Sequence, residues 1–574
     1  MRRRTALALA ALAGTAGCTS VRESSQESPA WGFTGSEYAV AADHELASRA
    51  GAGILAKGGN AVDAAVATSF ALAVTRPYSA GLGGGGFMLI KPAGKRAVVL
   101  DYREEAPSGA DASAYLDGNG AVIPGKTETG VWAIGVPGHV RGVLQALSEY
   151  GTMSRDEVMA PAIALAENGF PVDAHTHQAM EDILSRGKAH GLDAASAAEI
   201  ARTFLKDGAP YPVGATLKQP ALARSLRRIA ERGEAAFYEG EIAKAILGSI
   251  RRGGGPMTAG DLANYRVETR EPLRGRYRGY EVLGMPPPSS GGACVVQVLQ
   301  VLDGYPRGSL DAPSFYATLV EALKHAFADR AARLGDADVH SAVHADVAEM
   351  ISLERAAKIR AGIVPGETRS PERYGIAGLK DDHGTTHYSV MDKDGNAVAA
   401  TETVNTYFGS LVMAGDTGIV LNNELDDFSI RTDVPNAFGL LMSTRNVLSP
   451  GQRPLSSMSP TILLQGGEAV LAAGGSGGPR IITATLQAVL QIVEFAKTPA
   501  EAVALGRVHH QWAPNQVFAE KRLPREVLLR LENDGHAVVE LPASREAAVQ
   551  VVYRDGGRLF AASDPRKGGR PAGR

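Results

Sequence analysis

The periodicity of apolar residues changes near residue 384, and this change constrains the fold more than any other feature. Before it, many segments carry apolar residues at helical spacing. After it, TTHYSVMD at 385–392 and AVAATETVN at 397–405 alternate around the turn sequence DKDGN, which predicts a β-hairpin with hydroxyl-rich faces. The intervening residues 360–383 are poor in apolar side chains, as expected of a linker. The pattern predicts an α/β protein, with helices at 44–58, 61–74, 156–169, 221–233, 241–252, 293–302 and 313–334.

Composition excludes several classes of protein. The chain has 574 residues, of which 44% are hydrophobic and 21% charged, so it can bury a large core and is not a disordered chain. With a net charge of -3, the chain has no overall excess of positive charge that would favour binding to nucleic acid. The two cysteines, Cys18 and Cys294, exclude a disulfide framework and a cysteine-rich zinc site.

The amino terminus is typical of an export signal. Residues 1–17 combine an arginine run, a short apolar stretch and small residues before Cys18. The ending resembles a bacterial lipobox, although Thr15 stands where a larger aliphatic residue is usual. Two outcomes stay open, which are lipidation of Cys18 and ordinary cleavage near Gly17. Polar residues 18–37 would then form a flexible tether, and the protein would act in the periplasm or outside the cell.

Three local motifs suggest other chemistries but lack the context that those need. Residues 81–86 match G-x-G-x-x-G, yet a helix precedes and a strand follows, the reverse of a dinucleotide site. The pairs His175/His177 and His340/His344 lack further metal ligands at a recognised spacing, so no metal is expected.

The third motif is G-x-S-x-G around Ser476, which lies between a predicted strand and a predicted helix, as in a nucleophile elbow. Its downstream acid and base candidates, Asp534 and His536, are only two residues apart, which disfavours a triad. Glycines that open a helix can instead present backbone N–H groups to an oxyanion.

The boundary Gly384–Thr385 suggests a different nucleophile. Scission of this bond would give Thr385 a free α-amine, which titrates near neutral pH and can deprotonate the threonine's own hydroxyl. The same hydroxyl could make the cut by attacking the Gly384 carbonyl. Taken alone, a threonine at a strand start is more often a simple β-branched strand residue.

The surrounding motifs change that balance. From about residue 40 to 566 the chain resembles the γ-glutamyltranspeptidase (glutathione hydrolase) family of N-terminal-nucleophile hydrolases. The motifs that carry the resemblance stand in family order: GGNAVDAAVA at 58–67, GLGGGGFML at 81–89, DYREEAP at 101–107, PPPSSGG at 286–292, TTHYSV at 385–390, GNAVAATETVNTYFGS at 395–410, LNNELDDFS at 421–429, RPLSSMSPT at 453–461 and GGSGGPR at 474–480.

The resemblance implies a four-layer αββα sandwich built from two chains after self-cleavage. Residues 38–384 would form the large subunit and residues 385–574 the small catalytic subunit, and the two would remain together as a heterodimer. Thr385 would be the nucleophile and Thr403 would help to activate it. Gly477 and Gly478 would form the oxyanion hole, although the proline of this loop has moved relative to relatives.

The resemblance also implies a pocket for the two charges of a γ-glutamyl group. Arg103, Ser456 and Ser457 would bind the α-carboxylate, and Asn405, Glu424 and Asp427 would hold the α-ammonium. Glu424 stands where some bacterial relatives have glutamine. Phe438 would be the aromatic gate of a lid formed by residues 431–452.

The implied reaction forms a γ-glutamyl ester on the threonine from glutathione or another γ-glutamyl compound. Water, an amino acid or a dipeptide then takes the acyl group, without a metal or an organic cofactor. Two alternatives remain open at this point. One is an enzyme of the same fold with another acyl specificity, such as a cephalosporin (glutaryl) acylase, and the other is an unprocessed protein that only binds γ-glutamyl ligands.

Overall fold

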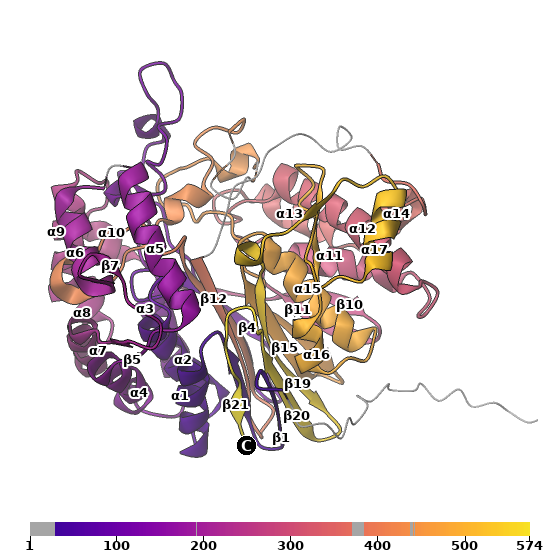
Figure 1. Ribbon diagram of the computed structural model, residues 1–574, viewed down its shortest axis with the longest axis horizontal. Coiled ribbons are helices and arrows are strands. Elements are labelled where there is room, and N and C mark those ends of the chain that lie inside the picture. Colours follow the sequence, from indigo (N-terminus) through magenta and orange to yellow (C-terminus); the bar gives the residue numbers. More distant parts are fainter. Residues whose placement is uncertain (1–28, 191, 370–383, 435, 437–439, 441) are drawn as a thin grey trace, which may run out of the picture.

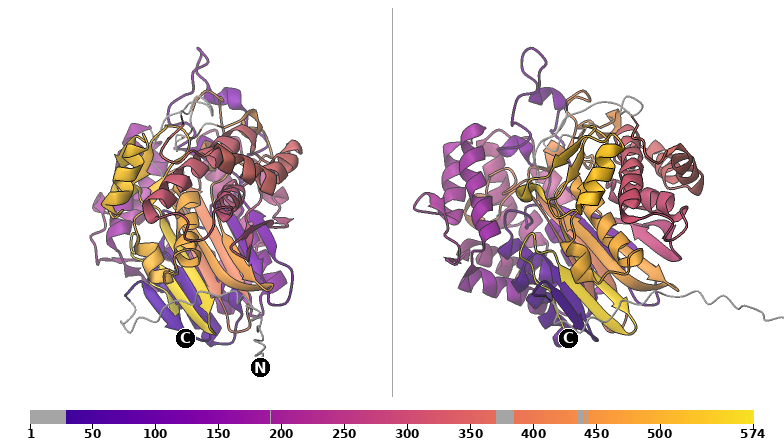
Figure 2. Two further views of the ribbon diagram at one scale, coloured as in Figure 1. Left: turned by 90° about the vertical axis from the view of Figure 1, so that its right-hand side faces the viewer. Right: turned by 45° about the vertical axis from the view of Figure 1, so that its right-hand side comes forward.

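The computed structural model describes residues 29–190, 192–369, 384–434, 436, 440 and 442–574. Two seven-stranded sheets stack face to face between two layers of helices (Figure 1). The views in Figure 2 show the same four layers from other sides. This arrangement confirms the expected αββα sandwich.

The first sheet contains the predicted hairpin at its centre. Neighbouring strands pair antiparallel throughout. Its strands, in spatial order, are β21 (Ala572–Gly573), β2 (Ala39–Ala42), β12 (Gly384–Met391), β13 (Ala397–Asn405), β3 (Gly85–Lys91), β4 (Val98–Tyr102) and β9 (Glu268–Arg270).

The second sheet is also antiparallel and draws on both ends of the chain. Residues 32–35 pair with residues 559–562 as its edge strand, so the prediction of a flexible tether over residues 18–37 is wrong for this part, because backbone hydrogen bonds hold it in the sheet. Apolar side chains such as Phe87, Leu89, Ile462 and Val552 fill the space between the two sheets. Its strands, in spatial order, are β1 (Gly32–Gly35), β20 (Arg558–Ser563), β19 (Ala548–Asp555), β15 (Glu468–Ser476), β14 (Thr461–Gln465), β11 (Tyr280–Gly284) and β10 (Leu273–Tyr277).

The helices before β9 cover the first sheet and those after β11 cover the second (Figure 1). The first layer comprises α1 (Glu45–Ala56), α2 (Ala61–Thr75), α3 (His139–Tyr150), α4 (Arg155–Asn168), α5 (Ala174–Ala189), α6 (Ala194–Phe204), α7 (Pro220–Arg232), α8 (Ala235–Tyr238), α9 (Glu241–Arg252) and α10 (Ala259–Asn264). The second comprises α11 (Gly291–Asp303), α12 (Ala312–Arg333), α13 (Ala342–Met350), α14 (Leu353–Gly362), α15 (Arg480–Val493), α16 (Pro499–Ala504) and α17 (Arg525–Asn533).

Helix α2 shows why the sequence folds in this way. Its surface is mostly apolar, and all of its residues are buried, as expected of a helix enclosed between a sheet and other helices. Asn60 caps its amino end and Asp63 completes the capping box. The predicted helices agree with the observed ones to within about two residues at each end, the usual uncertainty of a helix boundary.

Three small sheets lie outside the sandwich, formed by β5 (Phe170–Pro171) with β8 (Thr216–Leu217), β6 (Leu205–Lys206) with β7 (Ala209–Pro210), and β16 (Val508–His509), β17 (Val517–Ala519) and β18 (Val538–Glu540). Within the described ranges, no helix has both the length and the apolar character needed to cross a bilayer.

Candidate active site

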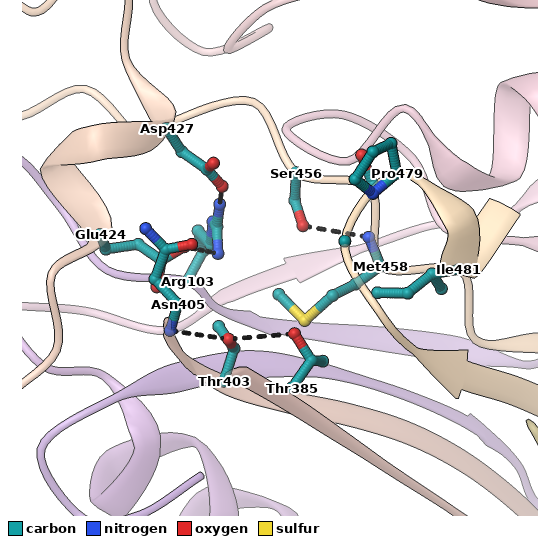
Figure 3. Close-up of a pocket in the computed structure, with 12 residues that line it drawn as sticks. Arg103, Thr385, Thr403, Asn405, Glu424, Asp427, Ser456, Met458, Pro479 and Ile481 are labelled. Atoms are coloured by element: carbon teal, nitrogen blue, oxygen red, sulfur yellow. Dashed lines mark hydrogen bonds and ion pairs between the residues drawn. The ribbon is translucent and has the colours of Figure 1, made fainter. Parts of the chain in front are cut away.

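Thr385 and Thr403 face each other across the central hairpin. They are register partners in β12 and β13, and their hydroxyl oxygens lie 3.3 Å apart (Figure 3). Thr403 donates its hydroxyl hydrogen to the carbonyl oxygen of Gly384 over 2.8 Å, and its oxygen accepts the backbone N–H of Asn405 over 2.8 Å. Because a hydroxyl has only one hydrogen to donate, Thr385 is the donor between the two threonines.

The backbone at Gly384 leaves no room for a side chain. A Cβ at this position would lie 2.1 Å from the carbonyl oxygen of Asn405. The strand register also shifts between Gly384 and Thr385, so the peptide bond between them sits at an irregularity of the sheet. Any side chain at this position would therefore clash with the neighbouring backbone.

The glycine loop lies where the sequence predicts it, between the end of β15 and the start of α15. Gly477 and Gly478 have φ angles of 128° and 56°, which glycine adopts without strain. Gly478 lines the same pocket as Thr385, whereas Gly477 packs against Ala547. The loop can therefore direct backbone N–H groups and the amino end of a helix toward the threonine.

The alternative serine triad does not assemble. Ser476 is buried and donates to Asp43 over 3.3 Å. Asp534 pairs with Arg530, and His536 lies 3.6 Å from Glu321. The hydrogen bond of Ser476 thus goes to Asp43, and neither Asp534 nor His536 takes part in it. Among the described residues, no group of histidine, cysteine, aspartate and glutamate side chains is arranged to hold a metal ion.

Arg103, just after β4, is the central cation of the pocket. It is 1% exposed and forms ion pairs with Glu424 and Asp427, which lie on one 3-10 turn (Figure 3). Glu104 lies 3.9 Å from the same Arg103 nitrogen that pairs with Glu424. The sequence analysis assigned the arginine to the carboxylate of a ligand and the two acids to its ammonium. In the structure all three side chains lie together, and the arginine pairs with both acids.

Burial has the largest effect on the pKa values of these acids. It raises the pKa of Glu424 well above its ordinary value, and it raises that of Asp427 although Arg103 opposes the change. Burial also raises the pKa of Glu104 to about 7. In the opposite direction, burial would lower the pKa of Arg103, but Glu424 and Asp427 outweigh it and raise that pKa.

The serine segment completes the pocket. Ser456 and Ser457 line it together with Met458, Pro479 and Ile481. The PPPSSGG turn holds this segment, because Ser456 donates its N–H to the carbonyl of Pro288 over 2.8 Å and accepts the N–H of Ser290 over 2.9 Å. Asn405 also lines the pocket, with its side-chain amide donating to the carbonyl of Asn423 over 2.9 Å.

Sequence reasoning missed a buried charged cluster beneath Thr385. Lys567 donates from Nζ to the carbonyl oxygen of Thr385 over 2.9 Å and lies 3.8 Å from Asp43. Asp43 also accepts the hydroxyl of Thr386 over 2.9 Å. Lys567 and Asp43 come from opposite ends of the chain, so no local pattern could have connected them with the threonine.

Comparison with known proteins shows the family to which this chain belongs. The model of the family described as gamma-glutamyltranspeptidase matches residues 47–574. A glutathione hydrolase proenzyme of Pseudomonas sp. (strain A14) is 41% identical over 92% of this chain and 92% of its own. This chain belongs to the γ-glutamyltranspeptidase family.

Solved structures agree with this membership. The γ-glutamyltranspeptidase of Helicobacter pylori is 38% identical and aligns with a TM-score of 0.54 over 57% of this chain and 92% of its own. A cephalosporin acylase from Bacillus halodurans is 28% identical and aligns with a TM-score of 0.84 over 97% of this chain and 99% of its own. The fold is therefore common to γ-glutamyltranspeptidases and to an acylase with another substrate.

Some predicted features of a γ-glutamyltranspeptidase lie outside the described residues. These are the export signal at 1–17, the lipobox residue Cys18 and the aromatic gate Phe438. The structure thus brings together Arg103, Thr385, Thr403, Asn405, Glu424, Asp427, Ser456, Ser457 and Gly478 around one pocket.

Proposed function

We propose that this protein is a self-processing threonine hydrolase that cleaves γ-glutamyl bonds, with glutathione as its representative substrate. The single observation that carries the proposal is the contact of Thr403 with both the Thr385 hydroxyl and the Gly384 carbonyl oxygen. This contact supports the proposal because one hydroxyl contacts both the proposed nucleophile and the carbonyl of the bond to be cut. Relatives named glutathione hydrolase proenzyme support it from sequence.

Self-cleavage follows from this geometry. The Thr385 oxygen attacks the carbonyl carbon of Gly384, and the oxyanion that forms accepts the hydrogen bond from Thr403. The C–N bond then breaks, its nitrogen takes a proton and an ester links Gly384 to the threonine oxygen. Water hydrolyses the ester, which leaves residues 385–574 with a free amino terminus and the preceding residues with a new carboxylate.

The liberated α-amine then serves as the base for catalysis. It takes the proton of the Thr385 hydroxyl while the oxygen attacks the γ-carbonyl of the substrate. Backbone N–H groups of Gly477 and Gly478 would bind the oxyanion. The cysteinylglycine amine of glutathione leaves with a proton, and water or the amine of an amino acid or dipeptide releases the acyl group from the ester.

The charge set of the pocket favours a γ-glutamyl group over the glutaryl alternative. A substrate carboxylate would replace the acids around Arg103, and the substrate ammonium would then pair with Glu424 and Asp427. A glutaryl group has no ammonium and would leave these two buried acids without a cation, which is costly. This exchange of partners supports γ-glutamyl specificity.

We propose export as well, because residues 1–17 read as an export signal. Lipidation of Cys18 would anchor the protein to a membrane, and cleavage near Gly17 would release it. The large and small subunits would remain together, since β12 and β13 of the small subunit pair with β2 and β3 of the large one.

Intact mass and activity test these proposals together. The purified protein should give two polypeptides in place of the 59.9 kDa precursor, and the smaller should begin at Thr385. It should hydrolyse γ-glutamyl-p-nitroanilide much faster than glutaryl-p-nitroanilide. An uncut chain with full activity would overturn the threonine mechanism, an uncut chain that only binds ligand would indicate a binding protein, and the reverse preference would indicate an acylase. The mass of the amino-terminal fragment reports the fate of Cys18.

A further inference from the structure

Arg330, near the end of α12, is a buried guanidinium that the proposed reaction does not use. Its side chain is 1% exposed. Nε donates to the hydroxyl oxygen of Ser290 over 2.9 Å, while Nη1 is buried and has no hydrogen-bond partner among the described residues. Burying a cation with so few hydrogen-bond partners costs free energy, so we expect Arg330 to have a functional role.

Within the part of the chain that the structure describes, Arg330 has no counter-charge of its own. Burial raises the pKa of the neighbouring Cys294 thiol to about 12, so this thiol is neutral. The adjacent acid Asp329 is bound by Arg355 over 2.7 Å and by Gln297 over 2.8 Å. The acid whose charge acts on Arg330 is Asp427, and Asp427 already pairs with Arg103.

Arg330 is connected to the pocket by two consecutive hydrogen bonds. Ser290 accepts from Arg330 and donates its own hydroxyl hydrogen to the carbonyl oxygen of Ser456 over 2.7 Å. Ser456 and the adjacent Ser457 line the pocket that contains Thr385. The guanidinium therefore lies two hydrogen bonds from the serine segment.

The charges of the pocket explain what this second guanidinium can do. Arg103 already pairs with Glu424 and Asp427, so part of its positive charge is engaged before a substrate carboxylate binds. Arg330 adds a positive charge near Ser456 and Ser457 but does not itself line the pocket. In a buried region such a charge acts over several ångströms, because little water screens it.

We propose that Arg330 is a positioning residue for the α-carboxylate of the substrate. It fixes the Ser456–Ser457 segment through Ser290 and supplies the second positive charge of the pocket. This inference rests on the proposed γ-glutamyl function and deepens it by naming a residue outside the pocket that selects for the carboxylate.

The test compares substrates that differ by one charge. γ-L-Glutamyl-p-nitroanilide carries both charges, its α-carboxamide lacks the carboxylate charge, and glutaryl-p-nitroanilide lacks the ammonium. Arg330→Met should lower kcat/KM at least tenfold for the two substrates with a carboxylate and leave that for the α-carboxamide within twofold. Arg333→Met, a control in the same helix with a 25% exposed side chain that pairs with Glu349, should change none of the three.

Ser290→Ala keeps the positive charge and breaks the hydrogen-bonded connection, so it should show the same selectivity in weaker form. If Arg330→Met fails to process into two chains, the Ser290→Ala variant tests the proposal by itself. An equal loss for all three substrates would mean a merely structural role and would overturn the proposal. So would a loss confined to substrates with an ammonium, since Arg330 would then act through Asp427. Failure of the wild-type protein to cleave γ-L-glutamyl-p-nitroanilide would instead reject the proposed function itself.

Discussion

Lys567, close to the carboxyl end of the chain, donates a hydrogen bond from its ammonium group to the carbonyl oxygen of Thr385 over 2.9 Å. The same ammonium lies 3.8 Å from Asp43, which binds the hydroxyl of Thr386. Lys567 and Asp43 thus bind the first two residues of the proposed small subunit, Thr385 and Thr386. This pair fixes the direction in which the threonine enters the sheet.

Lys567→Met should therefore slow both self-cleavage and turnover. A hydrogen bond to a charged group contributes about 1.5–3 kcal/mol, so we expect kcat/KM to fall by roughly ten- to a hundredfold. The exposed Lys521, which pairs with Glu540 on the surface, provides a matched control. Processing is followed on denaturing gels and turnover with γ-glutamyl-p-nitroanilide, and unchanged rates in Lys567→Met would contradict the positioning role.

Thr403→Val should impair self-cleavage more than Thr403→Ser. Valine keeps the shape of threonine but removes the donor to the Gly384 carbonyl and the acceptor for the Asn405 N–H. Loss of one donor to a developing oxyanion costs about 10²–10³ in rate in comparable sites. The rate of appearance of the two chains measures the effect, and normal processing of the valine variant would remove Thr403 from the mechanism.

Asp427→Asn should separate substrate binding from self-cleavage. The asparagine keeps the size of the side chain and removes the charge that would pair with the substrate ammonium, while Asp427 pairs with Arg103 and the Gly384 carbonyl accepts its hydrogen bond from Thr403. We expect normal processing and a KM for γ-glutamyl-p-nitroanilide that rises by roughly tenfold or more, as for a lost charge-assisted contact. An unchanged KM would show that Asp427 does not hold the ammonium.

Glu104→Gln should make the protein more stable at high pH. The pKa of Glu104 is about 7 in the folded protein because the carboxyl is buried, against 4.5 as its ordinary value. Between these values the unfolded chain releases the proton before the folded protein does, so wild-type stability falls as pH rises from 4.5 to 7.

The glutamine variant lacks this loss. Its free energy of unfolding should exceed that of the wild type by an amount that grows across this range and then stays constant, on the order of 3 kcal/mol. Denaturant unfolding at several pH values measures the difference, with the exposed Glu468→Gln as the control. A difference that did not vary with pH would mean that Glu104 is charged at pH 5 in the folded protein.

The sequence predicted the secondary structure well where a local rule applies. The hairpin of β12 and β13, the mostly apolar α2 and the glycine loop before α15 all depend on short-range patterns, because apolar periodicity and the backbone freedom of glycine act within a few residues. The resemblance to a family added the order of the motifs and, with it, the residues that gather around the pocket.

Other features could not be predicted in this way. Nothing near Lys567, Asp43 or Arg330 in the sequence marks these residues, since a charged side chain is usually exposed and their contacts come from segments distant in the sequence. The pairing of Arg103 with the acids that were assigned to the opposite end of a ligand is also visible only in the folded chain.

By itself, then, the sequence determined the elements, the position of the candidate nucleophile after a glycine and the kinds of charge that the pocket contains. The tertiary structure alone decided which charges neutralise one another, which hydroxyl donates to the carbonyl of Gly384, and which buried cations support the site from outside it. The physical reason is that electrostatic interactions depend on distance and burial in three dimensions, and sequence separation fixes neither.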